Sequence, residues 1–159
     1  MDYLWTPWRY QYIASLKNPS RCVFCLETSS EYDERDFVVF RGRLSFVILN
    51  IFPYTTGHLL VAPYAHNADF QKSSQEESAE MLELVKRCQS ALQQAYQPDG
   101  FNIGMNLGRC AGAGVEHHLH VHVVPRWIGD SNFMTIVGET RVLPETLETT
   151  FSKLRPHFS

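Results

Sequence analysis

The sequence predicts an α+β domain, with a mainly antiparallel sheet of about five strands, one long helix and a C-terminal helix. Three observations lead to this fold class. Short segments rich in Val, Ile and Phe are joined by turn residues such as Gly42, as strands are. Most of the connections are too short for parallel crossovers, which favours antiparallel pairing. One long segment has apolar residues at helical spacing, which predicts a helix packed against the sheet.

Each element has its own signal in the chain. The strands are expected at residues 37–41, 44–49, 57–62, 101–107 and 119–125. Ser74, followed three residues later by Glu77, predicts the start of the long helix. Its buried face is expected to carry Met81, Val85, Cys88, Leu92 and Ala95, and the Pro-Asp-Gly at residues 98–100 ends it. The C-terminal helix is expected at residues 144–154, with Pro144 in its first turn.

Length and composition indicate one domain. The chain has 159 residues, of which 44% are hydrophobic, and this is enough to fill a sizeable core. No internal repeat or linker is visible. We therefore expect a single domain over residues 1–159, with its core at 20–128, an N-terminal aromatic segment and the C-terminal helix.

Charge and hydropathy restrict the partners of the chain. The net charge of −3 provides no broad cationic surface, which disfavours nucleic acids and membranes as partners but leaves a local site for a small anion. The first 16 residues lack the apolar run of a secretory signal. The uncharged stretch 44–65 is interrupted by Asn50, Pro53 and Gly57, so two strands around a turn fit it better than a membrane span. A cytoplasmic location with reduced cysteines is expected.

Histidines are concentrated in one predicted strand. Four of the seven histidines fall within residues 117–122. Alternate residues of a strand share a face, so His118, His120 and His122 should point one way while the apolar residues between them point into the core. His117 should face away from the other three. Three crowded imidazoles that serve only structure are costly near neutral pH, so a functional site is the better interpretation.

Two kinds of chemistry use such a face. One is a metal held by a His-x-His pair, and the other is an imidazole nucleophile supported by its neighbours. The stretch 106–114 before the histidines is rich in glycine, and such loops let backbone N–H groups approach an anion. Phosphate is therefore the implied ligand.

Cys22 and Cys25 form a CxxC pair. Two thiolates at this spacing chelate one metal ion across a tight turn, which provides half of a zinc site. A redox pair and two plain structural cysteines are the alternatives, and the redox role is disfavoured because no βαβ unit is evident around the pair.

At this point the sequence resembles a known family. HLHVHVV at 118–124 matches the histidine-triad (HIT) signature, and GHLLVAP at 57–63 and LNIFP at 49–53 resemble further family segments. The resemblance covers roughly residues 20–128. WTPWR at 5–9 and PRW at 125–127 resemble a bacterial branch that includes diadenosine tetraphosphate phosphorylases.

The resemblance implies a fold of the HIT type and an activity. It implies a nucleotidyltransferase or hydrolase that cleaves nucleoside or dinucleoside polyphosphates at the α-phosphate, with diadenosine tetraphosphate phosphorolysis favoured. His120 would attack the α-phosphorus and form a covalent nucleotidyl-histidine, while His122 would contact the phosphate or the leaving oxygen. The implied partners are an adenine nucleotide, inorganic phosphate as an acceptor and a second copy of the chain in a homodimer.

The resemblance also implies nucleotide-binding residues. Asn50 stands where the family usually has an acidic residue on the ribose hydroxyls, and an amide still hydrogen-bonds them. Ile51, with Leu49 and Phe52, either lines an apolar base pocket or belongs to the core. Asn106 resembles a family residue that reaches the phosphate.

The loop before the triad departs from the family pattern. It lacks the usual Gln, Ser or Thr, so phosphate contacts are expected from the backbone N–H groups of Gly112, Ala113 and Gly114. Arg109 and Arg126 either assist them or are solvated surface charges.

The resemblance completes the metal site. His66 and His118 match the two histidines that join such a cysteine pair in the family, so Cys22, Cys25, His66 and His118 would hold a closed structural zinc. His120 would then stay available for chemistry, and no organic cofactor is expected. His58 either orients neighbouring groups or belongs to the core.

Two other functions remain open at this point. One is a zinc-dependent hydrolase in which a metal on His118 and His120 activates water. The other is a nucleotide-binding sensor module without catalysis, although a complete histidine triad argues against it.

Overall fold

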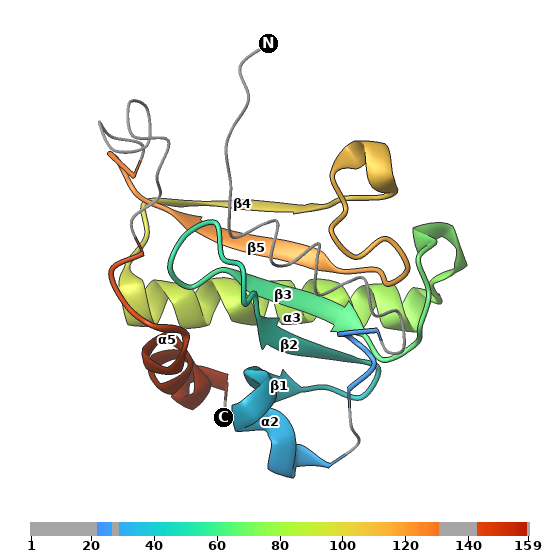
Figure 1. Ribbon diagram of the computed structural model, residues 1–159, viewed down its shortest axis with the longest axis horizontal. Helices are drawn as coiled ribbons and strands as arrows, with labels where there is room; N and C mark the ends of the chain where they lie inside the picture. Colours follow the sequence, from blue (N-terminus) through green and yellow to red (C-terminus); the bar gives the residue numbers. More distant parts are fainter. Residues whose placement is uncertain (1–21, 27–28, 131–142, 159) are drawn as a thin grey trace.

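The computed structural model describes residues 22–26, 29–130 and 143–158 (Figure 1). Its centre is a five-stranded sheet with the order β1-β2-β3-β5-β4, in which every neighbouring pair is antiparallel. The strands are β1 (Val38–Arg41), β2 (Ser45–Leu49), β3 (Leu59–Pro63), β4 (Gly100–Met105) and β5 (Val121–Arg126). The predicted α+β class and antiparallel sheet are confirmed.

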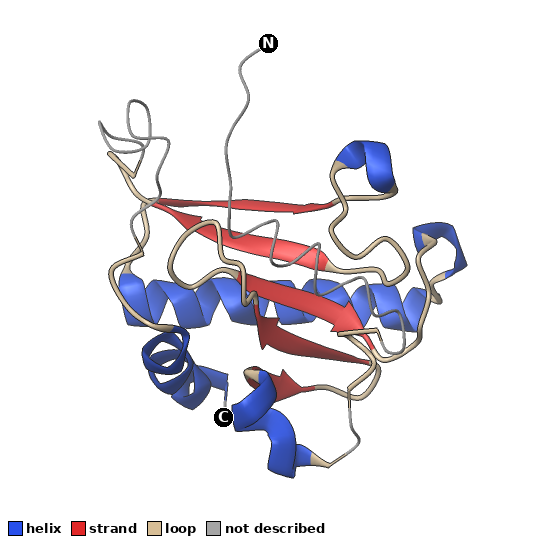
Figure 2. Ribbon diagram, in the orientation of Figure 1, coloured by secondary structure: helices blue, strands red, loops and turns tan. Residues whose placement is uncertain are grey.

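The helices lie mainly in one layer. The sheet lies in front of the long α3 (Gln75–Tyr96) in Figures 1 and 2, and α5 (Leu147–Leu154) packs beside α3. A short α2 (Asp33–Asp36) leads into β1. Single 3-10 turns occur at η1 (Ser30–Tyr32), η2 (Phe70–Lys72), η3 (Arg109–Ala111) and η4 (Arg155–Phe158). Among the described residues, no helix combines the length and the apolar character that crossing a membrane requires.

The long helix begins and is buried as predicted. The Ser74 hydroxyl accepts a hydrogen bond from the Glu77 N–H at 3.1 Å, which caps the first turn. The buried face comprises Met81, Leu84, Val85, Cys88, Ala91 and Leu92. Ala95, expected on this face, is only partly buried beside the core. The helix ends where Gln97 takes a left-handed conformation, with a φ of 48° just before Pro98.

The two faces of the sheet have different apolar clusters. The larger cluster fills the α3 face and includes Leu119, Val121 and Val123, as the strand alternation predicts. The smaller cluster lies on the opposite face and comprises Phe24, Val38, Phe46, Ile48, Leu60 and Ala62. This second face carries the site described below.

Several predicted boundaries are corrected by local geometry. The C-terminal helix begins at Leu147, because the Thr146 hydroxyl caps it, so Pro144 lies outside the first turn. Strand β3 begins at Leu59, because Gly57 has a φ of +78° and belongs to the preceding turn. Strand β5 begins at Val121, so His118 and His120 precede it. The N-terminal aromatic segment and WTPWR at 5–9 lie outside the described residues.

Candidate active site

A cavity of about 620 Å³ opens on the sheet face opposite to α3. His120 and His122 line it, together with these expected binding residues: Asn50, Ile51, Asn106, Gly112 and Gly114. Ala113 is not among its lining residues. The structure therefore brings together residues from four separate parts of the chain, as the predicted nucleotide site requires.

The floor of the cavity is a row of side chains across the sheet. Leu60 in β3 lies opposite His122 in β5, and Ile48 in β2 lies opposite Leu60. All three line the cavity, so the His122 imidazole is followed across the sheet by the apolar side chains of Leu60 and Ile48. An apolar surface next to polar groups suits a ligand with a flat ring at one end and a charged group at the other.

The ring of His120 is oriented by the backbone. Its Nδ1 lies 2.9 Å from the carbonyl oxygen of His118. Because a carbonyl only accepts, Nδ1 carries the proton, and Nε2 keeps its lone pair. Burial lowers the pKa of His120 below its ordinary value, so the ring is neutral at pH 7 and its lone pair is available to an electrophile.

His122 is held by a chain of hydrogen bonds through His58. The Tyr54 N–H donates to His58 Nδ1 at 3.1 Å, so the His58 proton is on Nε2. That N–H donates to His122 Nδ1 at 2.9 Å, which places the His122 proton on Nε2. The Asn106 side-chain amide lies 3.5 Å from this nitrogen, and its oxygen is the atom that can accept from the Nε2–H. Burial, with a smaller effect of the nearby His120, lowers the pKa of His122 to about 4. His122 is therefore a neutral hydrogen-bond donor, and the orienting role of His58 is the one that the geometry supports.

Asn50 shapes the loop between β2 and β3. Its side-chain oxygen accepts from the Phe52 N–H at 2.9 Å, and its amide nitrogen lies 3.3 Å from His58 Nδ1. The amide thus supports the histidine chain in addition to lining the cavity. Leu49, Ile51 and Phe52 all line the cavity. Ile51 is 49% exposed, whereas Leu49 is only 2% exposed and also belongs to the core cluster.

Backbone N–H groups of the glycine-rich loop before the triad already donate hydrogen bonds within the loop. The Gly112 N–H donates to the Arg109 carbonyl at 3.0 Å, and the Ala113 N–H donates to the Gly108 carbonyl at 3.4 Å. Two of the three N–H groups expected on phosphate are therefore engaged within the loop, and Gly114 is the third. The two arginines are surface charges outside the cavity lining: Arg109 pairs with Glu116, and Arg126 pairs with Asp130.

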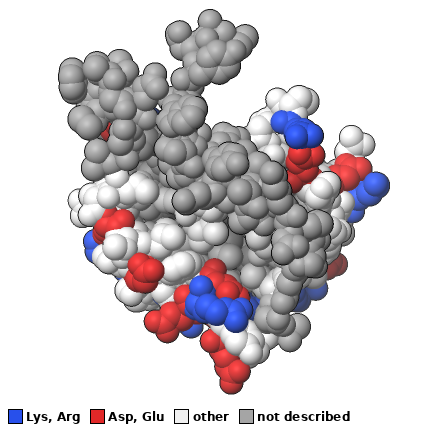
Figure 3. Space-filling model, viewed as in Figure 1, with Lys and Arg blue, Asp and Glu red and all other residues white. Residues whose placement is uncertain are grey.

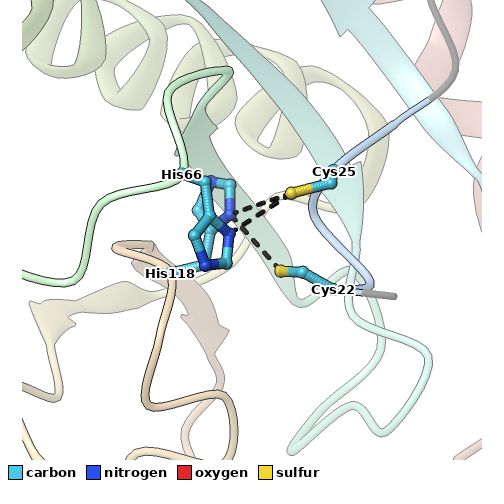
Figure 4. A group of neighbouring side chains, drawn as sticks. All are labelled: Cys22, Cys25, His66 and His118. Atoms are coloured by element: carbon cyan, nitrogen blue, oxygen red, sulfur yellow. Dashed lines mark hydrogen bonds between the residues drawn. The ribbon is translucent and has the colours of Figure 1, made fainter. Parts of the chain in front are cut away.

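The predicted metal ligands form one cluster. The ligand atoms of Cys22, Cys25, His66 and His118 all lie within 4.8 Å of one another, and Figure 4 shows the two thiols facing the two rings. His118 Nε2 donates to the Pro63 carbonyl at 2.8 Å, so its Nδ1 lone pair faces Cys22 Sγ at 3.4 Å. Two thiols and two imidazoles are the donor set of closed tetrahedral zinc sites, so these residues fit that metal.

Sequence reasoning missed the far end of the cavity. Arg35 and Asp36 from α2 line it there. Sequence reasoning also missed Phe24 and Leu26 from the segment that carries the cysteines, and the Phe24 ring centre lies 4.9 Å from that of His120. No motif or spacing in the sequence identifies Arg35 or Asp36 as site residues, because only the strand pairing brings α2 to this cavity.

Comparisons with known proteins agree with this geometry. The HIT domain family model matches residues 31–127. The AP-4-A phosphorylase of Mycobacterium tuberculosis (strain ATCC 25618 / H37Rv) is 40% identical over 154 residues, which cover 92% of this chain and 79% of that protein. A Zn-bound histidine triad family protein from Mycobacterium smegmatis is 32% identical, with a TM-score of 0.67 over 86% of this chain and 92% of that one.

A second solved structure has the same arrangement. It is a hypothetical histidine triad nucleotide-binding protein from Sulfolobus tokodaii strain7, 28% identical, with a TM-score of 0.67 over 86% of this chain and 91% of that one. The family match covers more than half of the chain and includes the histidines that line the cavity. The chain belongs to the histidine-triad, or HIT domain, family.

Proposed function

We propose that this HIT protein is a nucleotidyltransferase that cleaves dinucleoside polyphosphates at the α-phosphate, with phosphorolysis of diadenosine tetraphosphate as its favoured reaction. The observation that carries the proposal is the neutral His120 ring, whose Nε2 lone pair is left available by the Nδ1 bond to the His118 carbonyl. The 40% identity to an AP-4-A phosphorylase supports the choice of substrate.

The reaction runs in two displacements at phosphorus. His120 Nε2 attacks the α-phosphorus, a P–N bond forms, and the P–O bond to the rest of the polyphosphate breaks. The leaving oxygen takes the bonding pair, and it needs no full proton because a terminal phosphate has a second pKa of about 6. An oxygen of inorganic phosphate then attacks the same phosphorus, and the P–N pair returns to Nε2. Diadenosine tetraphosphate and phosphate thus give ATP and ADP.

The other cavity residues stabilise this chemistry. The His122 Nε2–H donates to a phosphate oxygen as negative charge develops, with the Asn106 amide beside it. The base lies on the apolar floor of Ile48 and Leu60, and Asn50 approaches the ribose. The whole chain of residues 1–159 acts as one domain around this site.

We further propose a structural zinc ion on Cys22, Cys25, His66 and His118. The ion would tie the cysteine segment, which carries Phe24, to His118, whose carbonyl holds the His120 ring. A catalytic zinc shared by His118 and His120 fits less well, because the His118 lone pair faces the cysteines and its other nitrogen donates to Pro63. This arrangement disfavours the zinc hydrolase alternative.

We also propose that the chain forms a homodimer through its edge strand β4. Among the residues that the structure describes, strand β4 pairs only with β5 and lies at the edge of the sheet. Ile103 within it is 46% exposed, and Leu107 just beyond it is 47% exposed. An edge strand with exposed apolar side chains pairs readily with a second copy of itself across a two-fold axis.

Product analysis tests the proposed reaction. Wild type with diadenosine tetraphosphate should give ATP and ADP when phosphate is present, and His120→Ala should lose at least about 1000-fold in kcat while still binding AMP. His117→Ala is the matched control, because His117 is exposed and lies outside the cavity lining. Wild-type activity in His120→Ala would reject His120 as the nucleophile. Binding of AMP without turnover in the wild type would reject the enzyme and favour a sensor.

A further inference from the structure

The cavity extends well beyond the histidines. The cross-strand row that begins at His122 continues through Leu60 and Ile48 to Val38 in β1. Three strand spacings of ~4.8 Å place the β1 end about 14 Å from His122. Arg35 and Asp36 line the cavity at this end, where α2 leads into β1.

Arg35 and Asp36 form a bidentate pair. Arg35 Nε lies 2.7 Å from one Asp36 oxygen, and Nη2 lies 2.8 Å from the other. The guanidinium carbon is also 4.3 Å from the centre of the Tyr32 ring, which supports its plane from one side. Within the pair, the positive charge of Arg35 offsets the negative charge of Asp36. The pair presents carboxylate acceptors and guanidinium donors side by side.

The backbone next to the pair is strained. Phe37 has a φ of 58° and a ψ of 34°, a left-handed conformation that is costly for a bulky residue. Its N–H donates to the carbonyls of Asp33 and Glu34, and its ring packs edge-on against Phe151 at 5.9 Å. This conformation turns the chain from α2 into β1 and holds Asp36 and Phe37 at the cavity wall. Such strain is concentrated at ligand sites, where the fold can maintain it.

We propose that the Arg35–Asp36 pair reads the edge of the nucleotide base and selects a 6-aminopurine. The Asp36 carboxylate accepts from the exocyclic amino group, and Arg35 donates to a ring nitrogen beside it. A 6-oxopurine presents an oxygen in place of the amino group, and that oxygen faces an acceptor with no proton between them. The inference rests on the proposed function, because the α-phosphate must lie at His120 for the base to reach α2.

The test compares adenine with hypoxanthine. AMP and IMP affinities are measured by calorimetry, and kcat/KM is measured for diadenosine and diinosine tetraphosphate. Because the Asp36 side chain is 27% exposed, wild type should favour adenine by about tenfold, less than a fully buried contact gives. In Asp36→Asn, whose amide presents either a donor or an acceptor, both ratios should fall to near one.

The chain offers a matched control. Arg126 and Asp130 form a second bidentate pair, with distances of 2.5 and 2.8 Å, and neither residue lines the cavity. Asp130→Asn should therefore keep the wild-type ratios. Melting temperatures of both variants are measured alongside, because a loss of fold would lower both affinities without changing their ratio.

Each outcome bears on one proposal. A wild-type ratio near one, or an unchanged ratio in Asp36→Asn, overturns base reading while leaving turnover intact. If AMP is preferred through Asp36 but no polyphosphate is cleaved, the base-reading inference holds and the proposed reaction fails. A ratio that falls equally in Asp130→Asn also overturns the assignment, because that residue is outside the cavity.

Discussion

His120, just before β5, and His122, within β5, lie side by side and have opposite hydrogen-bonding roles. Their ring centres are 4.9 Å apart, yet His120 offers a lone pair at Nε2 while His122 offers a proton at Nε2. The difference comes from what each Nδ1 meets, a carbonyl oxygen in one case and the His58 N–H in the other. One residue type is therefore suited to both proposed roles, nucleophile and donor, because the backbone and one buried partner select the tautomer.

The role of His58 is tested by replacing its ring. His58→Phe keeps most of the volume of a side chain that is 1% exposed but removes the N–H that orients His122. We expect kcat to fall by roughly 100-fold with little change in KM, because a donor to developing charge is misoriented. His58→Gln, which keeps a donor, should recover part of the loss. An equal loss in both variants, with lowered melting temperatures, would indicate a purely structural role.

The lowered pKa of His122 predicts a pH dependence of stability. The folded ring has a pKa of about 4 and the unfolded ring about 6.5, so the unfolded state binds the proton first as pH falls. The neutral ring's contribution is complete above pH 6.5 and is lost as pH falls from 6.5 to 4. The groups that face this ring are His58, His120, Tyr54 and Asn106.

Denaturant unfolding at pH 7 and pH 5 measures this effect. The free energy of unfolding of wild type should fall more steeply between these two values than that of His122→Asn, which has no ring to titrate. Comparison of the two proteins isolates His122 from the other buried histidines. Equal slopes would show that the folded His122 takes up its proton at the ordinary pH.

At the scale of elements, the sequence was informative wherever local periodicity and burial coincide. The start of α3 was predictable from Ser74 and Glu77, because a cap is a local interaction. The start of α5 was not predicted correctly, because Thr146 caps the helix and Pro144 lies before it. The sequence also could not predict that the N–H groups of Gly112 and Ala113 donate within the loop, because these hydrogen bonds depend on how the loop closes on Gly108 and Arg109.

The cysteine segment is the element whose position depends most on the proposed zinc. Cys22→Ser removes one of four ligands and should lower both the bound zinc and the melting temperature, because the ion closes a contact between segments 96 residues apart. Metal analysis should give about one zinc per chain in wild type and much less in the variant. Cys110→Ser is the control, since Cys110 is exposed and outside the cluster. Equal zinc content in the two variants would contradict the site.

At the scale of the whole molecule, the cavity is a product of strand order. Leu60, Ile48 and Val38 reach one row only because β3, β2 and β1 follow β5 across the sheet. The triad and the cysteine pair were predictable from spacing, whereas Arg35 and Asp36 join the site through long-range pairing that no local pattern encodes. Figure 3 shows acidic and basic side chains of the described residues next to one another along the margins of this view.

The proposed dimer is a property of the edge strand. Ile103→Glu places a charge on the exposed edge of β4 and should convert a dimer into a monomer in sedimentation velocity. Leu82→Glu is the matched control, because Leu82 is 60% exposed on α3, away from that edge. A dimer that survives Ile103→Glu, or a wild type that sediments as a monomer, would reject pairing through β4.

The most direct measurement is the mass of the enzyme quenched during turnover. Wild type mixed with diadenosine tetraphosphate and denatured under conditions that preserve P–N bonds should carry one added AMP, and peptide mapping should locate it on His120. His120→Ala should carry none. Rapid turnover without any adduct, or an adduct on another residue, would contradict the account.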